Sequence, residues 1–457
     1  ASASAATCAA GQAGSQACES AAGGSGRAHF AANRAVDLNR SGFTEHLPPR
    51  NLSKPAWTFP SGDRAFHQTP VIDADRNIYM GSDAGFIFSL DMHGKLRWKT
   101  KVGSGSCQCP SLLGDRVFTA SMDGNVMALE MATGKEIWNV KIAQDNPPDT
   151  YAVAAADDVV ISPANSQMGA GVPFGALEVV ALEAATGVVR WRYFLWMAQR
   201  TVTVNFLPVL YDGFVYFSDS AGGVICLSLE DGREMWALPG ADTSSFSLGG
   251  VAMGPNGVLY VGASSNKDPN EKGVIRAITR SGELLWERMV AQEIHAAPAI
   301  APLRPGGPLV LVIGTGSPSG DPMTFSERLA HKLGLGTEYV WEGTVYAMQA
   351  DNGRDIWQFE PPVWREKACA GSDMEQQCAP DLWSLPVITA DGAVYINWSA
   401  GGITYRLRDA NGDGVLDEKD PAEVTGYDAG TASTGPPVIA PGMLVVGACR
   451  FVYAFVE

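Results

Sequence analysis

Residues Thr69–Trp98 read TPVIDADRNIYMGSDAGFIFSLDMHGKLRW, and residues Cys109–Trp138 read CPSLLGDRVFTASMDGNVMALEMATGKEIW. Each stretch contains four apolar or aromatic runs that are separated by turns rich in Gly, Asp or Asn, and the last run carries Trp. Apolar residues alternate with a period of two, which indicates β-strands and excludes amphipathic helices. The unit therefore predicts four antiparallel strands joined by hairpins.

The unit recurs along the whole chain, and each copy closes on an aromatic residue. These residues are Trp57, Trp98, Trp138, Trp191, Trp236, Trp286, Trp357 and Tyr427. A sheet of about 40 residues cannot bury both of its faces, whereas sheets stacked radially cover one another. The last copy, Gly435–Val456, lacks a Trp strand, and Lys54–Phe59 supplies one before the first full copy. We therefore predict an all-β, eight-bladed β-propeller with four-stranded antiparallel blades, in which the N- and C-terminal strands close one blade.

Composition restricts the classes of partner. The chain has 457 residues and a formal net charge of −16, so it repels phosphate backbones, and we expect no nucleic-acid partner. No segment approaches about 18 consecutive apolar residues, so we expect no transmembrane span. Hydrophobic residues make up 46% of the chain, which is enough for a large buried core.

The eight cysteines bear on the cellular compartment. Cys8 and Cys18, and Cys369 and Cys378, are close pairs in polar surroundings, which favours disulfides and an oxidising compartment. Zinc sites are disfavoured because no His lies beside either pair. The Ala/Ser/Gly-rich start resembles a mature chain whose signal peptide has been removed. We therefore expect a periplasmic or extracellular protein.

The chain divides unevenly. We expect residues 1–50 to form a flexible, disulfide-containing N-terminal segment and residues 51–457 to form a single propeller. The long intervals between repeats predict insertions at 318–341 and 363–380 and a calcium loop at 409–420. The run Phe325–Leu335 within the first insertion is amphipathic and predicts a short helix.

The stretches Tyr79–Leu90 and Thr133–Trp138 resemble the repeat signature of the pyrroloquinoline quinone (PQQ) dehydrogenase-like propellers. The resemblance covers roughly residues 50–457 and is nearest in pattern to the polyvinyl alcohol dehydrogenase type. Enzymes of this family bind PQQ, but the same repeat also builds non-catalytic scaffolds for outer-membrane assembly. The chain has no CxxCH haem motif, so any cytochrome c partner would be a separate protein.

The resemblance implies a cofactor in the central funnel, against the first strand of each blade. Cys107 and Cys109 fall where the family's cysteine pair covers one face of PQQ, although Gln108 separates them. Alternatively, each of the two is an ordinary cysteine that pairs with Cys226 or Cys449. Phe246 or Trp383 would supply the opposite aromatic face.

Asp381 opens the sequence Asp381-Leu382-Trp383, which resembles the family's catalytic Asp-x-Trp motif. As a base, Asp381 would accept the hydroxyl proton of an alcohol. Alignment by blade order instead places Glu293 or His295 there, and a third interpretation is that Asp381 only begins a strand.

The family's metal ligands are only partly matched. The loop Asn165–Glu178 of the third repeat has no carboxylate before Glu178, and Ser317 stands where Asn is expected, so a Ca²⁺ ion beside PQQ would lack oxygen ligands. A different possibility is a soft metal such as copper, held by His67, His295, Cys107 and Cys109.

A separate motif predicts calcium. Asp409–Asp420 reads DANGDGVLDEKD and places oxygen ligands at loop positions 1, 3, 5, 7, 9 and 12. The ligands are the side chains of Asp409, Asn411, Asp413, Asp417 and Asp420 and the carbonyl of Val415. Because the loop replaces a blade hairpin, we expect a structural role.

Two functions remain. We favour an exported binding or scaffold propeller with a structural calcium site, which holds a protein partner or a small molecule at the funnel mouth. The alternative is a PQQ-dependent alcohol or aldehyde dehydrogenase that passes electrons to a separate cytochrome c.

Overall fold

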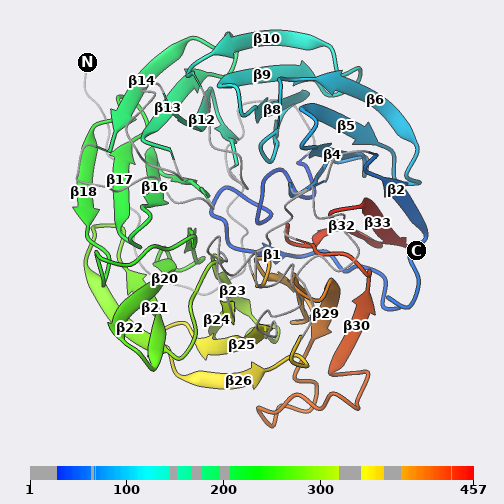
Figure 1. The fold of residues 1–457 in the computed structure, drawn as a ribbon, viewed down its shortest axis with the longest axis vertical. Helices are drawn as coiled ribbons and strands as arrows, with labels where there is room; N and C mark the ends of the chain where they lie inside the picture. Colours follow the sequence, from blue (N-terminus) through cyan, green and yellow to red (C-terminus); the bar gives the residue numbers. More distant parts are fainter. Residues whose placement is uncertain are drawn as a thin grey trace, which may run out of the picture.

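The computed structural model describes residues 28–62, 66, 68–105, 107–144, 152–165, 176–195, 206–318, 341–364, 382–433 and 435–457. Every regular element within these ranges is a β-strand, and the strands form eight sheets around a central axis, as Figure 1 shows. The predicted all-β, eight-bladed propeller is confirmed. Within the described part of the chain, no helix has the length and apolarity to cross a bilayer.

Each blade is a meander whose first strand lies nearest the axis. Blade 1 comprises β3 (Val71–Ile72), β4 (Ile78–Gly81), β5 (Phe86–Leu90) and β6 (Leu96–Lys101). Blade 2 comprises β7 (Ser111–Leu113), β8 (Arg116–Ala120), β9 (Asn125–Glu130) and β10 (Glu136–Lys141). Blade 3 comprises β11 (Ala154–Ala156), β12 (Val159–Ala164), β13 (Glu178–Glu183) and β14 (Val189–Phe194). Blade 4 comprises β15 (Val209–Tyr211), β16 (Phe214–Ser218), β17 (Val224–Ser228) and β18 (Glu234–Leu238).

The second half of the ring follows the same order. Blade 5 comprises β19 (Val251–Met253), β20 (Leu259–Asp268), β21 (Glu271–Ile278) and β22 (Leu284–Val290). Blade 6 comprises β23 (Ala299–Pro302), β24 (Leu309–Pro318), β25 (Trp341–Gln349) and β26 (Asp355–Phe359). Blade 7 comprises β27 (Val387–Thr389), β28 (Val394–Trp398), β29 (Ile403–Leu407) and β30 (Val424–Asp428). Blade 8 comprises β31 (Val438–Ala440), β32 (Met443–Gly447), β33 (Phe451–Val456) and the N-terminal strand β2 (Trp57–Pro60).

The ring closes as predicted. Strand β2 pairs antiparallel with β33, with Trp57 opposite Ala454 and Pro60 opposite Phe451. The two ends of the described chain thus share blade 8. Neighbouring blades around the ring bury their apolar faces against one another. This arrangement leaves the ring without a free terminal sheet.

The repeated Trp joins neighbouring blades. Six of the closing indoles donate Nε1–H to a carbonyl in the hairpin turn between the third and fourth strands of the next blade. Trp191, for example, reaches the Leu229 oxygen at 2.9 Å. A Cβ added to Gly232 in that same turn would lie 2.6 Å from the Trp191 ring, so a glycine is required there. The Gly-containing turns of the repeat therefore form docking sites for the preceding Trp.

Residues 28–50 correct one prediction. We expected them to belong to a flexible segment, but residues 31–47, here called the axial segment, lie at the centre of the ring (Figure 1). Seven of the eight blades donate a backbone N–H to a carbonyl of this segment: Ile72 to Ala31, Leu112 to Ala32, Leu210 to Leu38, Met253 to Asn39, Ile300 to Ser41, Ile388 to Gly42 and Gly442 to Leu47. Strand β1 (Phe43–Thr44) also pairs in parallel with β27.

The physical reason is hydrogen-bond satisfaction. The innermost strands of a propeller have one unpaired edge that faces the axis, and buried N–H groups need acceptors. The axial segment supplies those acceptors. Residues 1–27, including Cys8 and Cys18, lie outside the described residues, as do Cys369, Cys378 and the predicted helix Phe325–Leu335.

Candidate functional site

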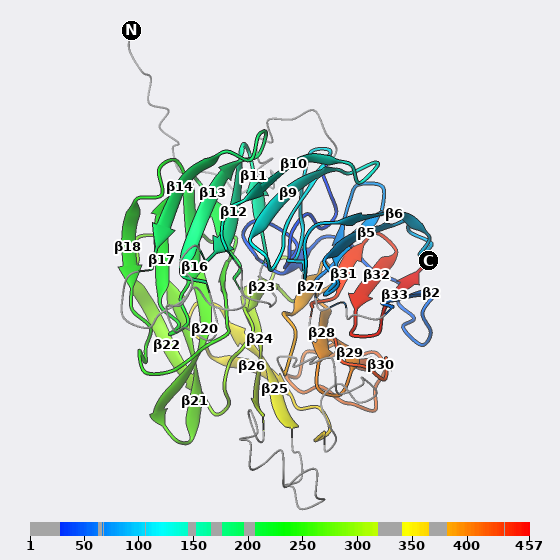
Figure 2. The same ribbon diagram turned by 45° about the horizontal axis from the view of Figure 1, so that its top comes forward.

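One face of the ring collects the connections between blades. In an antiparallel meander, the connection from one blade to the next and the turn between the second and third strands lie on the same side. We call this side the funnel face, because the inner strands begin there. The long hairpins β20–β21 and β24–β25 extend beyond the ring on this side, at the bottom of Figure 2.

Cys107 and Cys109 stand at the start of blade 2 and are both fully buried. Cys107 packs between blades 1 and 2, where a Cβ on Gly81 would lie 2.9 Å from the Cys107 Cβ. Cys109 instead lies on the axis in contact with Ala35 of the axial segment. The two sulfurs therefore lie in different surroundings and do not form one wall.

The bonding of these cysteines is also defined. Cys107, Cys109 and Cys226 are free thiols, so neither of the pairings that we considered for Cys107 and Cys109 occurs. Cys449 is disulfide-bonded, and none of these three thiols is its partner. The Cys109 thiol donates to Gln68 Oε1 at 3.0 Å, and burial raises the pKa of the Cys107 thiol far above its usual range.

Trp383 lies within the seam between blades 6 and 7. It is 2% exposed, and its ring centroid is 4.7 Å from that of Trp398. A Cβ on Gly314 would lie 2.5 Å from the Trp383 Cβ, and one on Gly316 would lie 2.4 Å from Leu382 Cδ1. The structure thus brings Leu382-Trp383 of the predicted Asp-x-Trp motif together with Gly314-Thr315-Gly316, the stretch that precedes Ser317. Asp381 itself lies outside the described residues.

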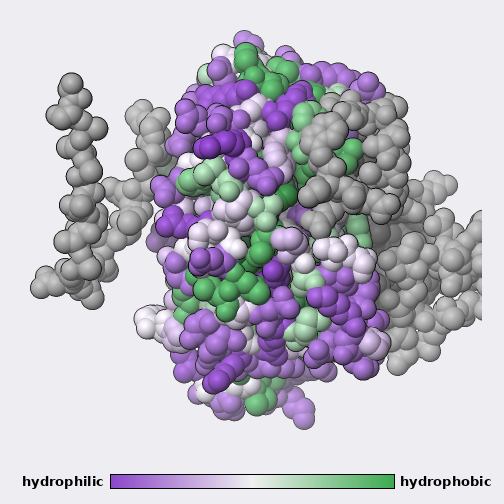
Figure 3. All heavy atoms as spheres, turned by 90° about the vertical axis from the view of Figure 1, so that its left-hand side faces the viewer, coloured by the Kyte–Doolittle hydropathy of each residue, from purple (hydrophilic) through white to green (hydrophobic). Residues whose placement is uncertain are grey.

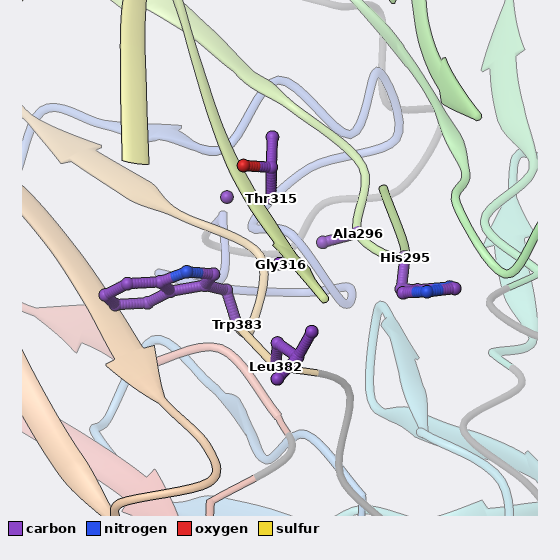
Figure 4. Close-up of a pocket in the computed structure, with 7 residues that line it drawn as sticks. His295, Ala296, Thr315, Gly316, Leu382 and Trp383 are labelled. Carbon is purple, nitrogen blue, oxygen red and sulfur yellow. The ribbon is translucent and has the colours of Figure 1, made fainter. Parts of the chain in front are cut away.

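A small pocket opens beside this contact. It is lined by His295, Ala296, Gly314, Thr315, Gly316, Leu382 and Trp383. Figure 4 shows the His295 ring on the opposite side of the pocket from the Trp383 indole. His295 Nε2 lies 3.1 Å from Glu293 Oε2, and this hydrogen bond lowers the pKa of the Glu293 carboxyl. The two residues that we considered as alternatives to Asp381 thus form one acid–imidazole pair at the funnel face.

The remaining expected contacts are dispersed. Phe246 is 49% exposed on the connection between β18 and β19, whereas His67 lies outside the described residues. Glu178 is buried and is held by Arg192 at 2.9 Å. The side chain of Ser317 is not described. Among the described residues, no three His, Cys, Asp or Glu side chains come together as a metal site would require.

Comparison with known proteins agrees with the repeat and the fold. A PQQ-repeat family model, described as outer membrane protein assembly factor BamB, matches residues 52–245. Outer membrane protein assembly factor BamB of Yersinia pestis is 24% identical over 66% of this chain and 77% of its own length. The chain is an eight-bladed β-propeller, and its repeats are similar to the PQQ-like repeats of these proteins.

Two further comparisons include enzymes. Quinohemoprotein alcohol dehydrogenase ADH IIB of Pseudomonas putida is 28% identical over 29% of this chain and 20% of its own length. The solved structure of a europium-containing methanol dehydrogenase has a TM-score of 0.61 at 13% identity and covers 94% of this chain and 98% of its own. At that identity the likeness concerns the fold alone.

The propeller carries its predicted calcium loop between β29 and β30, on the face opposite the funnel. Within the loop, Asp409 accepts the N–H of Gly412 and of Gly414, and Asp413 accepts that of Val415. The side chain of Asp409 is 10% exposed. Asn411, Asp413, Asp417 and Asp420 are exposed, so among the predicted ligand side chains only that of Asp409 is largely buried.

Sequence inspection missed a carboxylate that holds this loop together. Glu423 is 1% exposed and accepts the N–H of Asn411 and of Asp417 through its two oxygens. It lies just beyond the motif, at the start of β30, so the loop pattern gave no signal for it. The axial segment was missed for a similar reason, since its partners are spread over seven blades.

Proposed function

We propose that this propeller is an exported binding module that holds a protein partner on its funnel face. The observation that supports this proposal is topological: the connections between successive blades and the extended hairpins β20–β21 and β24–β25 all lie on that face. Loops carried by a rigid scaffold are where proteins place recognition. An assembly or scaffold role also fits the name of the Yersinia pestis relative.

The axial segment supports docking on the face and disfavours passage through the ring. It fills the centre behind the funnel, where Ala35 meets the innermost residues of several blades. A partner on the funnel face would therefore find the funnel closed at its base by the axial segment. Met235 and Leu285 on the outer strands are 42% and 53% exposed. On the side of the molecule that Figure 3 shows, hydrophobic areas are interrupted by hydrophilic ones, which is typical of ordinary surface.

A periplasmic or extracellular location belongs to the same proposal. It fits the disulfide at Cys449 and the name of the relatives, which places assembly at an outer membrane.

The second candidate is a PQQ-dependent alcohol or aldehyde dehydrogenase with a separate cytochrome c. The contact between the Gly314–Gly316 and Leu382–Trp383 motifs and the Glu293–His295 pair favour it. Against it, Cys107, Cys109, Phe246 and Trp383 lie in four different surroundings and form no flat slot. A quinone acceptor needs such a slot with a cation at its edge.

An activity assay separates the two candidates. We expect PQQ and Ca²⁺ added to the purified protein to give no alcohol-dependent dye reduction. Turnover above background that is lost in Asp381→Asn, in a variant that melts like the parent, would move the dehydrogenase to first place.

We also propose that the Asp409–Asp420 loop binds one Ca²⁺ and fastens blade 6 to blade 7. The loop stands where the other blades carry the turn that receives a Trp. Accordingly, Trp357 Nε1 has no acceptor among the described residues, although its side chain is 2% exposed. Instead, Leu416 packs against the cluster that contains Trp357, and Gly414 closely approaches the Ile356 carbonyl. Calcium would make this substitute contact rigid.

A further inference from the structure

Arg40 is a fully buried cation at the centre of the ring. Its side chain is 0% exposed and comes from the axial segment, on a backbone with a φ of 56°. Nε donates to the Pro208 oxygen at 3.0 Å, and Nη1 donates to the Arg34 oxygen at 2.8 Å. Nη2 is buried and has no hydrogen-bond partner in the described part of the chain. A buried donor that stays unsatisfied destabilises the folded state.

The charge of Arg40 is poorly compensated. Asp37 is the nearby carboxylate, but its oxygens accept the backbone N–H and the hydroxyl of Ser41 at 3.0 and 2.6 Å. Burial raises the pKa of Asp37, which weakens it as a counter-ion. Arg34 is a second cation, only 1% exposed, whose charge repels that of Arg40. Burial lowers the pKa of Arg40 to about 10, so Arg40 remains protonated at neutral pH.

A second unsatisfied donor lies at the entry to blade 1, next to Cys109. Thr69 is 1% exposed, its backbone N–H donates to Cys109 Sγ at 3.2 Å, and its hydroxyl has no partner among the described residues. Cys109 also lies within electrostatic range of Arg40. The surrounding layer is apolar and mostly small, with Ala35, Cys109, Ala152, Leu207, Ala297 and Leu385. Such a layer excludes large or strongly hydrated ligands.

We propose that the centre of the ring binds one small monovalent anion of halide size, with Arg40 Nη2 as the charged donor. A water molecule would satisfy a hydrogen bond but would leave the excess positive charge in an apolar interior. A halide accepts the hydrogen bond and also neutralises the charge, and it loses its hydration shell more easily than a multivalent anion does. An anion at this site would stabilise the folded ring, and this inference does not depend on the proposed function.

Anomalous diffraction from crystals grown in sodium bromide locates the anion directly. We expect a bromide peak within hydrogen-bonding distance of Arg40 Nη2. The absence of such a peak, or a water molecule at that position in crystals grown in bromide, would overturn the proposal.

Solution melting tests whether the anion binds at ordinary concentrations. At equal ionic strength, sodium chloride should raise the Tm by about 2 °C relative to sodium gluconate, and Arg40→Met should abolish the difference. Arg280→Met, which removes a half-exposed arginine, is the control and should keep it. If Arg40→Met fails to fold, the difference in Tm between chloride and gluconate in the parent protein still tests the proposal. A bromide peak without chloride-specific stabilisation would mean binding at crystal concentration only and would overturn the proposal.

Discussion

The indole of each closing Trp has two roles that can be separated by mutation. It fills the space under the next blade's glycine, and in six blades it also donates a hydrogen bond across the seam. Trp357 is buried in the seam with Leu416 packed against its cluster, but it makes no such hydrogen bond among the described residues, since the Asp409–Asp420 loop stands where its acceptor would be. A matched pair of substitutions therefore measures the hydrogen bond.

We expect Trp191→Phe to lower the free energy of unfolding by about 2–3 kcal/mol, because it removes packing and leaves the Leu229 carbonyl without the indole donor. Trp357→Phe should cost about 1 kcal/mol less, because the N–H that it removes is unsatisfied. Urea unfolding of both variants gives the comparison. Equal losses would show that the indole donors contribute nothing across these seams.

At the scale of single elements, local patterns were predictable and distant ones were not. The four strands, the Gly-containing turns and the closing aromatics are determined by near neighbours in the chain, so they were visible as a repeat. The strands that carry Trp57 and Trp98 are observed as predicted, in β2 and β6. The burial of Trp383 was not predictable, because it depends on Gly314 and Gly316, far away in sequence.

The calcium loop has its own test at this scale. We expect Asp409→Asn combined with Asp413→Asn to remove one equivalent of bound Ca²⁺ in a calorimetric titration, because each substitution removes a charged oxygen ligand. A chelator should lower the Tm of the parent and leave that of the double variant unchanged. Asp115→Asn, at a side chain that is 99% exposed, is the control. Unchanged stoichiometry in the double variant would refute the assignment.

At the scale of the whole molecule, the ring is closed twice, by β2 in blade 8 and by the axial segment at the centre. The first closure was predicted because the last repeat lacks a strand. The second was not, because a segment that gives one hydrogen bond to each of several blades has no periodic pattern. Because residues 1–27 are low in complexity, we predicted a flexible segment that included residues 28–50 as well.

Two truncations separate these closures and a third is the control, all in reducing buffer so that disulfides do not contribute. Deleting residues 1–50 keeps β2 but removes the acceptors of seven inner N–H groups, so the Tm should fall by more than about 10 °C. Deleting residues 1–61 removes β2 as well and should abolish cooperative melting. Deleting residues 1–27 leaves every described contact in place and should leave the Tm nearly unchanged. A 1–50 truncation that melts like the full chain would show that the axial segment does not hold the ring.

The proposal that the funnel face binds a protein partner is tested most directly by site-specific photo-crosslinking in cells of the source organism. Phe246 on the funnel face and Met235 on an outer strand are 49% and 42% exposed, so a photoreactive residue at either position samples its surroundings equally well. The account predicts one discrete protein adduct, identified by mass spectrometry, from position 246 and none from position 235. Adducts from position 235 alone, or from neither position, would contradict it.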